Sequence, residues 1–156
     1  MNDWLMKSEP DCFGIDDLAA APGGVEMWDG VRNYQVRNMI RDHMRPGDQA
    51  FFYHSNTKTP GVVGVMEIAS EAYPDPTAFD PEDEHYDPKS DPEWPRWYCV
   101  DVRFVEKWSR TVTLQEMRRS PRLEGLPLLR KGNRLSIVPV TTDQWAAIRE
   151  MAGEAK

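Results

Sequence analysis

The sequence predicts an α+β fold in which helices surround one mostly antiparallel, curled or barrel-like sheet. Three observations lead to this prediction. The 156 residues are the usual size of one domain, and no internal repeat divides them. The predicted elements follow in the order strand, helices, three or more strands, helix, strand, helix. That order lacks the regular helical crossovers that a parallel sheet needs. We expect residues 1–156 to form a single domain.

The first third of the chain predicts one strand and two helical segments. Residues 3–8 predict a short strand, and residues 14–21 predict one or two helical turns that end at residues 22–24, Pro-Gly-Gly. Residues 28–31 predict a turn that leads into a longer helix. In that helix the apolar stripe falls at i, i+3, i+4, i+7 and i+8, on Val36, Met39, Ile40, His43 and Met44. The Pro-Gly-Asp turn of residues 46–48 ends it.

The middle of the chain predicts a hairpin and a further strand, separated by an irregular segment. Residues 50–54 are rich in aromatic side chains and residues 62–69 in β-branched ones, and both patterns are typical of strands. Gly64 predicts a bulge or a close backbone approach in the second strand. Residues 73–95 hold six of the thirteen prolines and predict a long irregular loop, and the strand that follows argues against a linker. The next strand shows alternating apolar side chains at Tyr98, Val100, Val102 and Phe104.

Two capping boxes predict the remaining helices. Thr113 and Thr141 are each followed three residues later by Glu or Gln, which is the pattern of a helix start. The second box opens a C-terminal helix that should pack through Trp145 and Ile148. Between these two helices, residues 135–140 predict the last strand.

The charges of the chain are segregated along the sequence. The net charge of −7 argues against a protein that binds phosphates nonspecifically, because such a protein normally carries a basic surface. Residues 67–93 hold ten acidic residues and one basic residue, whereas residues 94–134 hold ten basic residues and four acidic ones. A locally basic face is therefore compatible with the acidic total.

Composition also limits the class of protein. A hydrophobic content of 40% and a charged content of 29% are typical of a globular chain. No apolar run approaches the roughly 18 residues of a membrane span, and no basic residue precedes Lys7. We expect no signal peptide, no membrane segment and a cytoplasmic location, or a nuclear one in a eukaryote. Cys12 and Cys99 form no CxxC motif, so we expect two ordinary thiols and no zinc site.

Polar side chains gather at four predicted strand ends, where a rigid sheet commonly supports binding sites. These are residues 7–9 after the first strand, residues 28–34 before the long helix, residues 54–56 at a hairpin strand end and residues 130–136 before the last strand. Because they are set among aromatic residues, they predict a binding pocket rather than a catalytic centre.

Each group also has a structural interpretation, which the sequence leaves open. Residues 7–9 could be a solvated edge, Asn33 a helix cap and His54 a hydrogen-bonded structural histidine. Trp28 and Trp97 could belong to the core. The last group could be a solvated basic face, formed by Arg130, Lys131 and Arg134.

The sequence gives little support for catalysis. Ser8 or Ser55 with His54 and Asp101 could form a triad, but no GxSxG motif accompanies them. No GxGxxG motif or P-loop is present either, so no nucleotide cofactor is implied. We expect a non-enzymatic binding function without a cofactor or a metal.

Eight short motifs, in order along nearly the whole chain, resemble those of the EVE domain family. They are residues 4–10 (WLMKSEP), 28–35 (WDGVRNYQ), 52–56 (FYHSN), 61–64 (GVVG), 72–75 (AYPD), 86–90 (YDPKS), 95–97 (PRW) and 128–130 (LLR). The resemblance implies a PUA-like barrel of five or six strands flanked by helices, with no established enzymatic activity. It implies that the Pro-rich acidic loop of residues 73–95 is an ordered segment wrapped on the barrel. It also implies a pocket for a modified nucleobase in DNA or RNA, with methylated or hydroxymethylated cytosine as the leading type.

The resemblance implies that the polar residues at these strand ends form one side of a slot the size of a nucleobase. The residues expected to line it are Lys7, Ser8, Glu9, Trp28, Asn33, Tyr34, His54, Ser55, Trp97 and Ser136. Those expected to hold flanking phosphates are Arg32, Arg130, Lys131 and Arg134. The base should stack beside Trp28, with Ser8, Asn33 and His54 at its edge. One departure from the family is Ile137-Val138-Pro139, where the last strand is expected to carry a Gln.

Two other functions stay open at this point. One is an enzyme that acts on a small nucleoside-like substrate in the same pocket. The other is a protein-interaction module that uses the acidic loop. In the leading interpretation the chain is a monomer whose partner is a nucleic acid with a modified base, and no membrane is involved.

Overall fold

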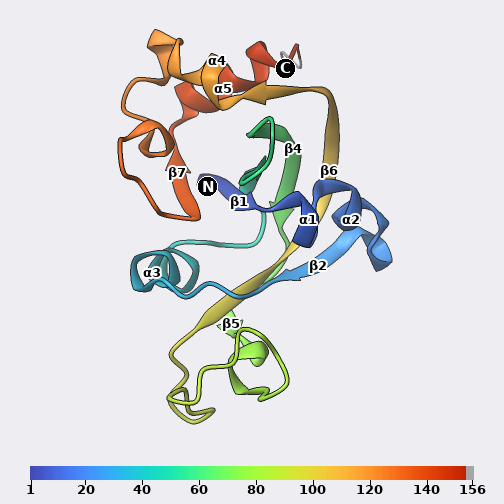
Figure 1. The fold of residues 1–156 in the computed structure, drawn as a ribbon, viewed down its shortest axis with the longest axis vertical. Coiled ribbons are helices and arrows are strands. Elements are labelled where there is room, and N and C mark those ends of the chain that lie inside the picture. The colour runs from blue at the N-terminus through green and yellow to red at the C-terminus, as the bar shows by residue number, and fades with distance from the viewer. Residues whose placement is uncertain (154–156) are drawn as a thin grey trace.

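The fold is built on one curved sheet with helices against both of its faces (Figure 1). The computed structural model describes residues 1–153. Six strands follow the order β2-β6-β4-β3-β1-β7, and the two-residue β5 pairs with β6 outside this path. The strands are β1 (Asp3–Ser8), β2 (Val25–Trp28), β3 (Gln49–His54), β4 (Gly61–Ile68), β5 (Tyr73–Pro74), β6 (Tyr98–Thr113) and β7 (Ile137–Val140).

The helices lie in the connections between these strands. The α-helices of the described residues are α1 (Pro10–Phe13), α2 (Ile15–Ala20), α3 (Tyr34–Asp42), α4 (Leu114–Arg118) and α5 (Thr142–Met151). Short 3₁₀ segments add η1 (Pro22–Gly24), η2 (Pro76–Phe79), η3 (Pro121–Leu123) and η4 (Pro127–Leu129). The two predicted capping boxes are confirmed, because Thr113 and Thr141 each accept a backbone N–H of the first turn of α4 and α5.

The predicted antiparallel sheet is confirmed, with one parallel pair. β1 runs parallel to β3, from Asp3 opposite Gln49 to Ser8 opposite His54. The chain between them passes through α1, α2, β2 and α3, which is long enough for the crossover that a parallel pair requires. The other pairings are antiparallel, including the predicted hairpin of β3 and β4.

Gly64 lies where two strands leave no room for a side chain. A Cβ atom at this position would overlap the carbonyl oxygen of Glu106 and the side chain of Ile15. The register between β4 and β6 also shifts between Val62 and Gly64. The predicted close approach is therefore confirmed, and it lets α2 pack directly on the sheet.

The sequence prediction missed two short elements beside the cleft described below. The sequence predicts a turn at residues 28–31 but no strand before it. Residues 25–28 form strand β2, and only Trp28 of the four is buried. Helix α1 has four residues, none of them buried. Neither element carries a buried periodic pattern, so hydrophobic periodicity could not reveal it.

The core lies on both faces of the sheet because side chains alternate along each strand. Trp4 and Met6 of β1 belong to the face covered by α2 and α3, whereas Leu5 belongs to the face covered by α4 and α5. On the second face, the predicted packing of the C-terminal helix is confirmed: the ring of Trp145 stacks on Phe51 at 3.8 Å between centroids.

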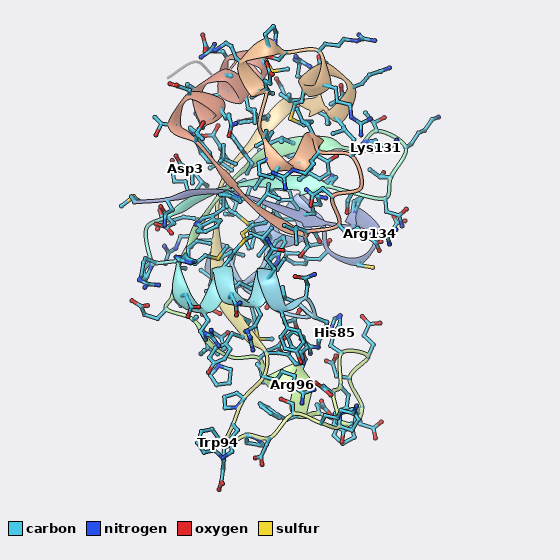
Figure 2. All side chains as sticks on the ribbon, turned by 90° about the vertical axis from the view of Figure 1, so that its left-hand side faces the viewer. Asp3, His85, Trp94, Arg96, Lys131 and Arg134 are labelled. Carbon is cyan, nitrogen blue, oxygen red and sulfur yellow. The ribbon has the colours of Figure 1, made fainter. Side chains whose placement is uncertain are left out.

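Residues 75–97 form a lobe that projects from one end of the sheet (Figures 1 and 2). Trp94 lies at its tip in Figure 2 and is 82% exposed. The lobe is held at its base by Trp97, whose indole N–H donates to Asp87 Oδ2 at 2.7 Å. The Trp97 ring also stacks on Tyr34 at the start of α3, with 4.9 Å between centroids.

Asp75 is the second anchor of the lobe, and it is completely buried. Arg32 Nη1 lies 3.1 Å from Asp75 Oδ2, and the Gly30 N–H donates to the same oxygen at 2.8 Å. The other oxygen accepts from the N–H and the hydroxyl of Thr77. Burial by itself would raise the pKa of Asp75, but these hydrogen bonds outweigh it and lower the pKa below 3.8.

Replacing Asp75 by Asn should destabilise the protein by on the order of 2 kcal/mol near neutral pH, because the amide loses the charged hydrogen bonds. The measurement is urea unfolding of both proteins at several pH values. A group with a lowered pKa stabilises the fold above its unfolded pKa. The difference between the two proteins should therefore shrink as the pH falls below 3.8.

Asp80→Asn is the matched control for this prediction. Asp80 lies in the same lobe and is exposed, and its carboxylate accepts a local N–H, that of Glu82. Its replacement should change the unfolding free energy by less than about 0.5 kcal/mol. Equal losses from the two substitutions would contradict the anchoring role of Asp75.

Candidate functional site

A cleft of about 1090 Å³ opens between the end of β1, helix α1, the end of β2 and the lobe. Its walls come from residues 7–9, 12–13, 26–29 and 82–85. The volume is comparable to that of sites for small organic ligands. Four of the predicted site residues meet here, namely Lys7, Ser8, Glu9 and Trp28.

Lys7 brings a half-buried ammonium group into this cleft. Burial lowers the pKa of Lys7 because the charged form loses water. Its Nζ makes no hydrogen bond or ion pair with any of residues 1–153, so its donors are available to a ligand. By contrast, the Ser8 hydroxyl donates to the Phe13 carbonyl at 2.6 Å. The Glu9 carboxylate accepts from Asn56 at 3.0 Å.

Trp28 forms an aromatic wall of the cleft and is only 7% exposed. Its ring meets Phe13 and Phe52 edge-on, at 6.3 Å and 5.5 Å between centroids. The indole N–H has no acceptor among residues 1–153. Among residues 1–153, Arg149 Nε is the one fully buried side-chain nitrogen or oxygen atom that lacks a hydrogen-bond partner. The Trp28 N–H also lacks a partner but is not in that class, so it keeps access to solvent. Trp28 therefore combines a fixed apolar surface with a free donor.

Asp29 supplies a half-buried acceptor next to that donor in the chain. Burial, followed by the charge of Asp75, raises the pKa of Asp29. No cation among residues 1–153 lies within ion-pair distance of its carboxylate. An unpaired carboxyl group at this depth is suited to accept N–H donors from a bound ligand.

The turn after Asp29 brings the lobe to the cleft. Gly30 has φ 78°, a left-handed conformation that favours glycine. A Cβ atom on Gly30 would lie 2.7 Å from His85 Nε2, so the His85 ring packs against this glycine. Arg32 completes the contact by donating to the His85 carbonyl at 2.6 Å. The Trp-Asp-Gly-Val-Arg motif thus shapes one wall and fixes the opposite one.

The cleft is acidic overall. Six of its lining residues are carboxylates, against one lysine and one histidine: Glu9, Glu26, Asp29, Glu82, Asp83 and Glu84. Such a lining repels phosphate groups. It favours an uncharged planar ligand that offers hydrogen-bond donors, with Phe13, Met27 and Trp28 against its apolar surface.

The other predicted site residues lie outside the cleft lining. His54 Nε2 accepts the Ile15 N–H at 3.2 Å, and burial lowers the pKa of His54, which favours the neutral ring. Asn33 caps α3 through the Val36 N–H, and Tyr34 stacks on Trp97. Ser55 and Ser136 make backbone hydrogen bonds to β1. The Ser55 N–H donates to the Ser8 carbonyl, and the Ser136 carbonyl accepts the Lys7 N–H.

The residues predicted to hold phosphates also separate into two groups. The Arg32 guanidinium donates hydrogen bonds to Asp75, Thr77 and two backbone carbonyls, which hold it at the base of the lobe. The others are exposed on the connection before β7: Arg130, Lys131 and Arg134. Figure 2 shows Lys131, Arg134 and His85 on the same side of the molecule.

Sequence reasoning missed Phe13, Met27, Asp29 and residues 82–85 as cleft residues. Asp29 stands inside a motif that the sequence had singled out, and the aromatic Trp28 beside it was the available signal. Residues 82–85, three acidic residues and a histidine, gave no such signal, because only the folded lobe brings them to β1 and β2.

The structure also bears on the two chemistries considered from the sequence. The triad of Ser8, His54 and Asp101 is not assembled. Asp101 accepts a hydrogen bond from the Tyr73 hydroxyl at 2.6 Å, and the Ser8 hydroxyl donates to the Phe13 carbonyl. Within residues 1–153, no group of three or more His, Cys, Asp or Glu side chains is arranged to hold a metal ion. No helix in the same range has the length and apolar character to span a bilayer.

Comparison with known proteins places the chain in a family. The model of the EVE domain matches residues 2–151. Thymocyte nuclear protein 1 of Homo sapiens is 45% identical in an alignment of 158 positions, which covers 91% of this chain and 70% of that protein.

Solved structures agree with this assignment. A crystal structure of a Pseudomonas syringae protein superposes with a TM-score of 0.92 at 47% identity, over 96% of this chain and 99% of that one. Human THYN1 in complex with DNA containing 5-methylcytosine superposes with a TM-score of 0.89 at 42% identity, over 100% of this chain and 99% of that one. The family model, the sequence identity and the shared fold all cover nearly the entire chain, and the chain belongs to the EVE domain family.

Proposed function

We propose that this chain recognises a modified cytosine, 5-methylcytosine or its hydroxymethyl form, in DNA, and that the base enters the cleft beside Trp28. The observation that carries the proposal is the cleft itself, which sets a free indole N–H, an unpaired ammonium and an unpaired carboxyl group around an aromatic wall. The superposition on human THYN1 bound to DNA containing 5-methylcytosine supports the choice of ligand.

The donors and acceptors of the cleft complement the edge of cytosine. Cytosine offers an amine at N4 and acceptors at N3 and O2. Asp29 accepts from the N4 amine, as carboxylates do in base recognition. The Lys7 ammonium, which has three donors, donates to the two acceptors, and the ring of Trp28 packs against the face of the base. The 5-methyl group then contacts the apolar side chains of Phe13 and Met27. The acidic lining excludes phosphates, so only the base enters.

The magnitudes predict modest discrimination between methylated and plain cytosine. Flipping a base out of a duplex costs a few kcal/mol, and stacking on an aromatic side chain returns about 1–3 kcal/mol per base. Burial of one methyl group adds about 0.8 kcal/mol, which is several-fold in affinity. Hydrogen bonds at the base edge supply the rest of the affinity.

We further propose that recognition proceeds without chemical turnover. Ser8 and His54, the two residues suited to act as nucleophile and base, are each engaged in hydrogen bonds that hold helices α1 and α2 against the sheet.

The first test is a fluorescence titration with oligonucleotides that carry one 5-methylcytosine or one plain cytosine, as single strands and as duplexes, at low salt. We expect binding to both, with a several-fold preference for the methylated base. Trp28→Phe keeps an aromatic wall but with a smaller face, so it should weaken stacking of both bases without unfolding the protein. Absence of binding to every modified oligonucleotide would contradict the proposed function.

The second test concerns the assignment of Asp29. Thymine and 5-methylcytosine share the 5-methyl group, but thymine has an acceptor at position 4 where cytosine has an amine. Asp29→Asn replaces an acceptor by a group that can donate to that position. The variant should lose about 1–3 kcal/mol of preference for 5-methylcytosine over thymine.

Glu26→Gln is the matched control, because Glu26 also lines the cleft but is exposed. It should leave the ratio of the two affinities unchanged. If Asp29→Asn keeps the wild-type ratio while the protein still binds 5-methylcytosine, Asp29 does not read the amine.

A further inference from the structure

The unpaired arginines of the described residues gather in one segment. Seven arginines form ion pairs with carboxylates: Arg32, Arg41, Arg96, Arg103, Arg110, Arg122 and Arg149. Arg37 and Arg45 donate to backbone carbonyls. Within residues 1–153, four arginine side chains make neither a hydrogen bond nor an ion pair, and all four lie between residues 118 and 134: Arg118, Arg119, Arg130 and Arg134.

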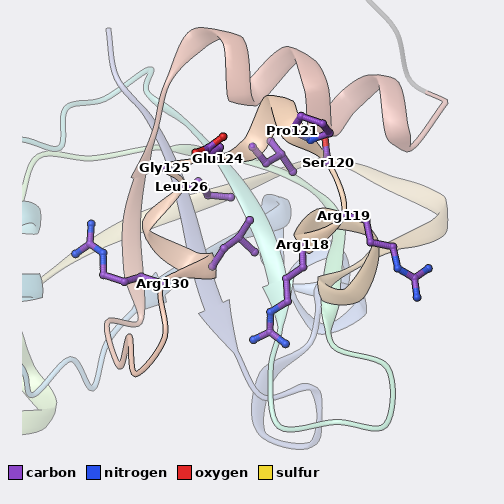
Figure 3. A pocket seen from close by; sticks show the side chains of 10 residues that line it. Arg118, Arg119, Ser120, Pro121, Glu124, Gly125, Leu126 and Arg130 are labelled. Carbon is purple, nitrogen blue, oxygen red and sulfur yellow. The ribbon is translucent and has the colours of Figure 1, made fainter.

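Three of these arginines surround a second hollow, about 560 Å³ in volume, beside α4, η3 and η4. Arg118, Arg119 and Arg130 are exposed lining residues, Leu126 is a buried one, and Glu124 is the one carboxylate in the lining. Figure 3 shows the three guanidinium groups pointing in different directions. Such a spread does not suit one small anion. It suits several negative groups spaced along a chain, as in a nucleic-acid backbone.

The local charge of this surface is opposite to that of the whole molecule. Residues 118–134 hold six basic residues and one acidic residue, in a chain with a net charge of −7. At physiological salt, charges more than about 8 Å apart are largely screened. The acidic residues of the cleft and the lobe therefore do not neutralise an arginine unless they lie next to it.

The segment that carries the unpaired arginines, residues 118–134, is joined to the cleft lining by a backbone hydrogen bond just beyond its end. The Lys7 N–H donates to the Ser136 carbonyl at 2.8 Å, which fixes the end of the basic segment beside the cleft-lining residues 7–9. Lys131 and Arg134 lie on the same side of the molecule as His85 of the cleft (Figure 2). A strand that places one base in the cleft can extend from there along residues 134 to 118.

We propose that the hollow bordered by Arg118, Arg119 and Arg130 is a second contact site, which binds backbone phosphates of the nucleic-acid strand whose base occupies the cleft. This inference rests on the proposed function and deepens it. In this arrangement two surfaces of opposite charge have different roles. The acidic cleft selects the base, and the arginine surface around the hollow binds the backbone without regard to sequence.

The test compares a triple variant, Arg118→Gln with Arg119→Gln and Arg130→Gln, with the wild-type protein. The probes are a 15-nucleotide single strand and a trinucleotide, each with one central 5-methylcytosine, and a plain 15-nucleotide strand. The triple variant should bind both long strands at least roughly tenfold more weakly at low salt. The slope of log affinity against log salt should fall by about 0.7 for each phosphate that the variant no longer binds. Its affinity for the trinucleotide and its preference for the methylated base should not change.

The control variant removes three positive charges from elsewhere, with Arg41→Gln, Arg103→Gln and Lys107→Gln. These side chains are exposed and already paired with carboxylates, so the control should leave the salt slope unchanged. Thermal unfolding checks both variants, and the triple variant should be no less stable than wild type because its arginines have no partners among residues 1–153.

The outcomes separate the two proposals. An unchanged salt slope in the folded triple variant overturns the arginine site while the preference for the methylated base still supports the cleft. Loss of plain-strand affinity in a protein without any methyl preference supports the arginine site and contradicts the proposed function. Sedimentation tests another occupant, the acidic lobe of a second copy. If wild type self-associates, the triple variant does not, and the salt slopes agree, the surface is a protein interface and the proposal fails.

Discussion

Asp75 carries a negative charge at a completely buried position, and the shape of the cleft follows from how that charge is stabilised. A buried carboxylate is unfavourable unless hydrogen bonds and a cation replace its hydration. Here Thr77 provides two donors, Gly30 a third, and Arg32 the positive charge. Because Gly30 and Arg32 follow directly after Trp28 and Asp29, the same contacts fix the aromatic wall. Arg32 also holds His85, so they fix the opposite wall as well.

The motif from Trp28 to Tyr34 therefore has two kinds of role that a sequence pattern does not separate. Trp28 and Asp29 face the cleft, whereas Gly30 and Arg32 hold the lobe and Asn33 starts helix α3. Substitution of either kind would disturb binding, the first by removing a group that faces the ligand and the second by releasing a wall. This is the reason why the experiments proposed for the cleft use variants that preserve shape.

In the proposed mode of binding, charge separation gives the molecule two surfaces with different tasks. The cleft carries six acidic side chains, and the segment from Arg118 to Arg134 carries the unpaired arginines. A single basic pocket would attract phosphates into the space that we propose for the base. With the charges apart, a phosphate is repelled from the cleft and attracted nearby. The chain thereby remains acidic in total, which limits nonspecific binding to nucleic acid.

The sequence by itself determined the local structure and the family. Capping threonines, turn residues and alternating strands act over a few neighbouring residues, so the main strands, α3, α4 and α5 could be predicted. Only the tertiary structure decided the membership of the cleft. His54 and Asn33 were predicted at the site, but their polar atoms are used to hold helices α2 and α3. Residues 82–85 reach the cleft because Asp75 and Arg32 bind one another across 43 residues of sequence. Such a contact depends on burial and on the shared partners of one carboxylate, and no local pattern encodes it.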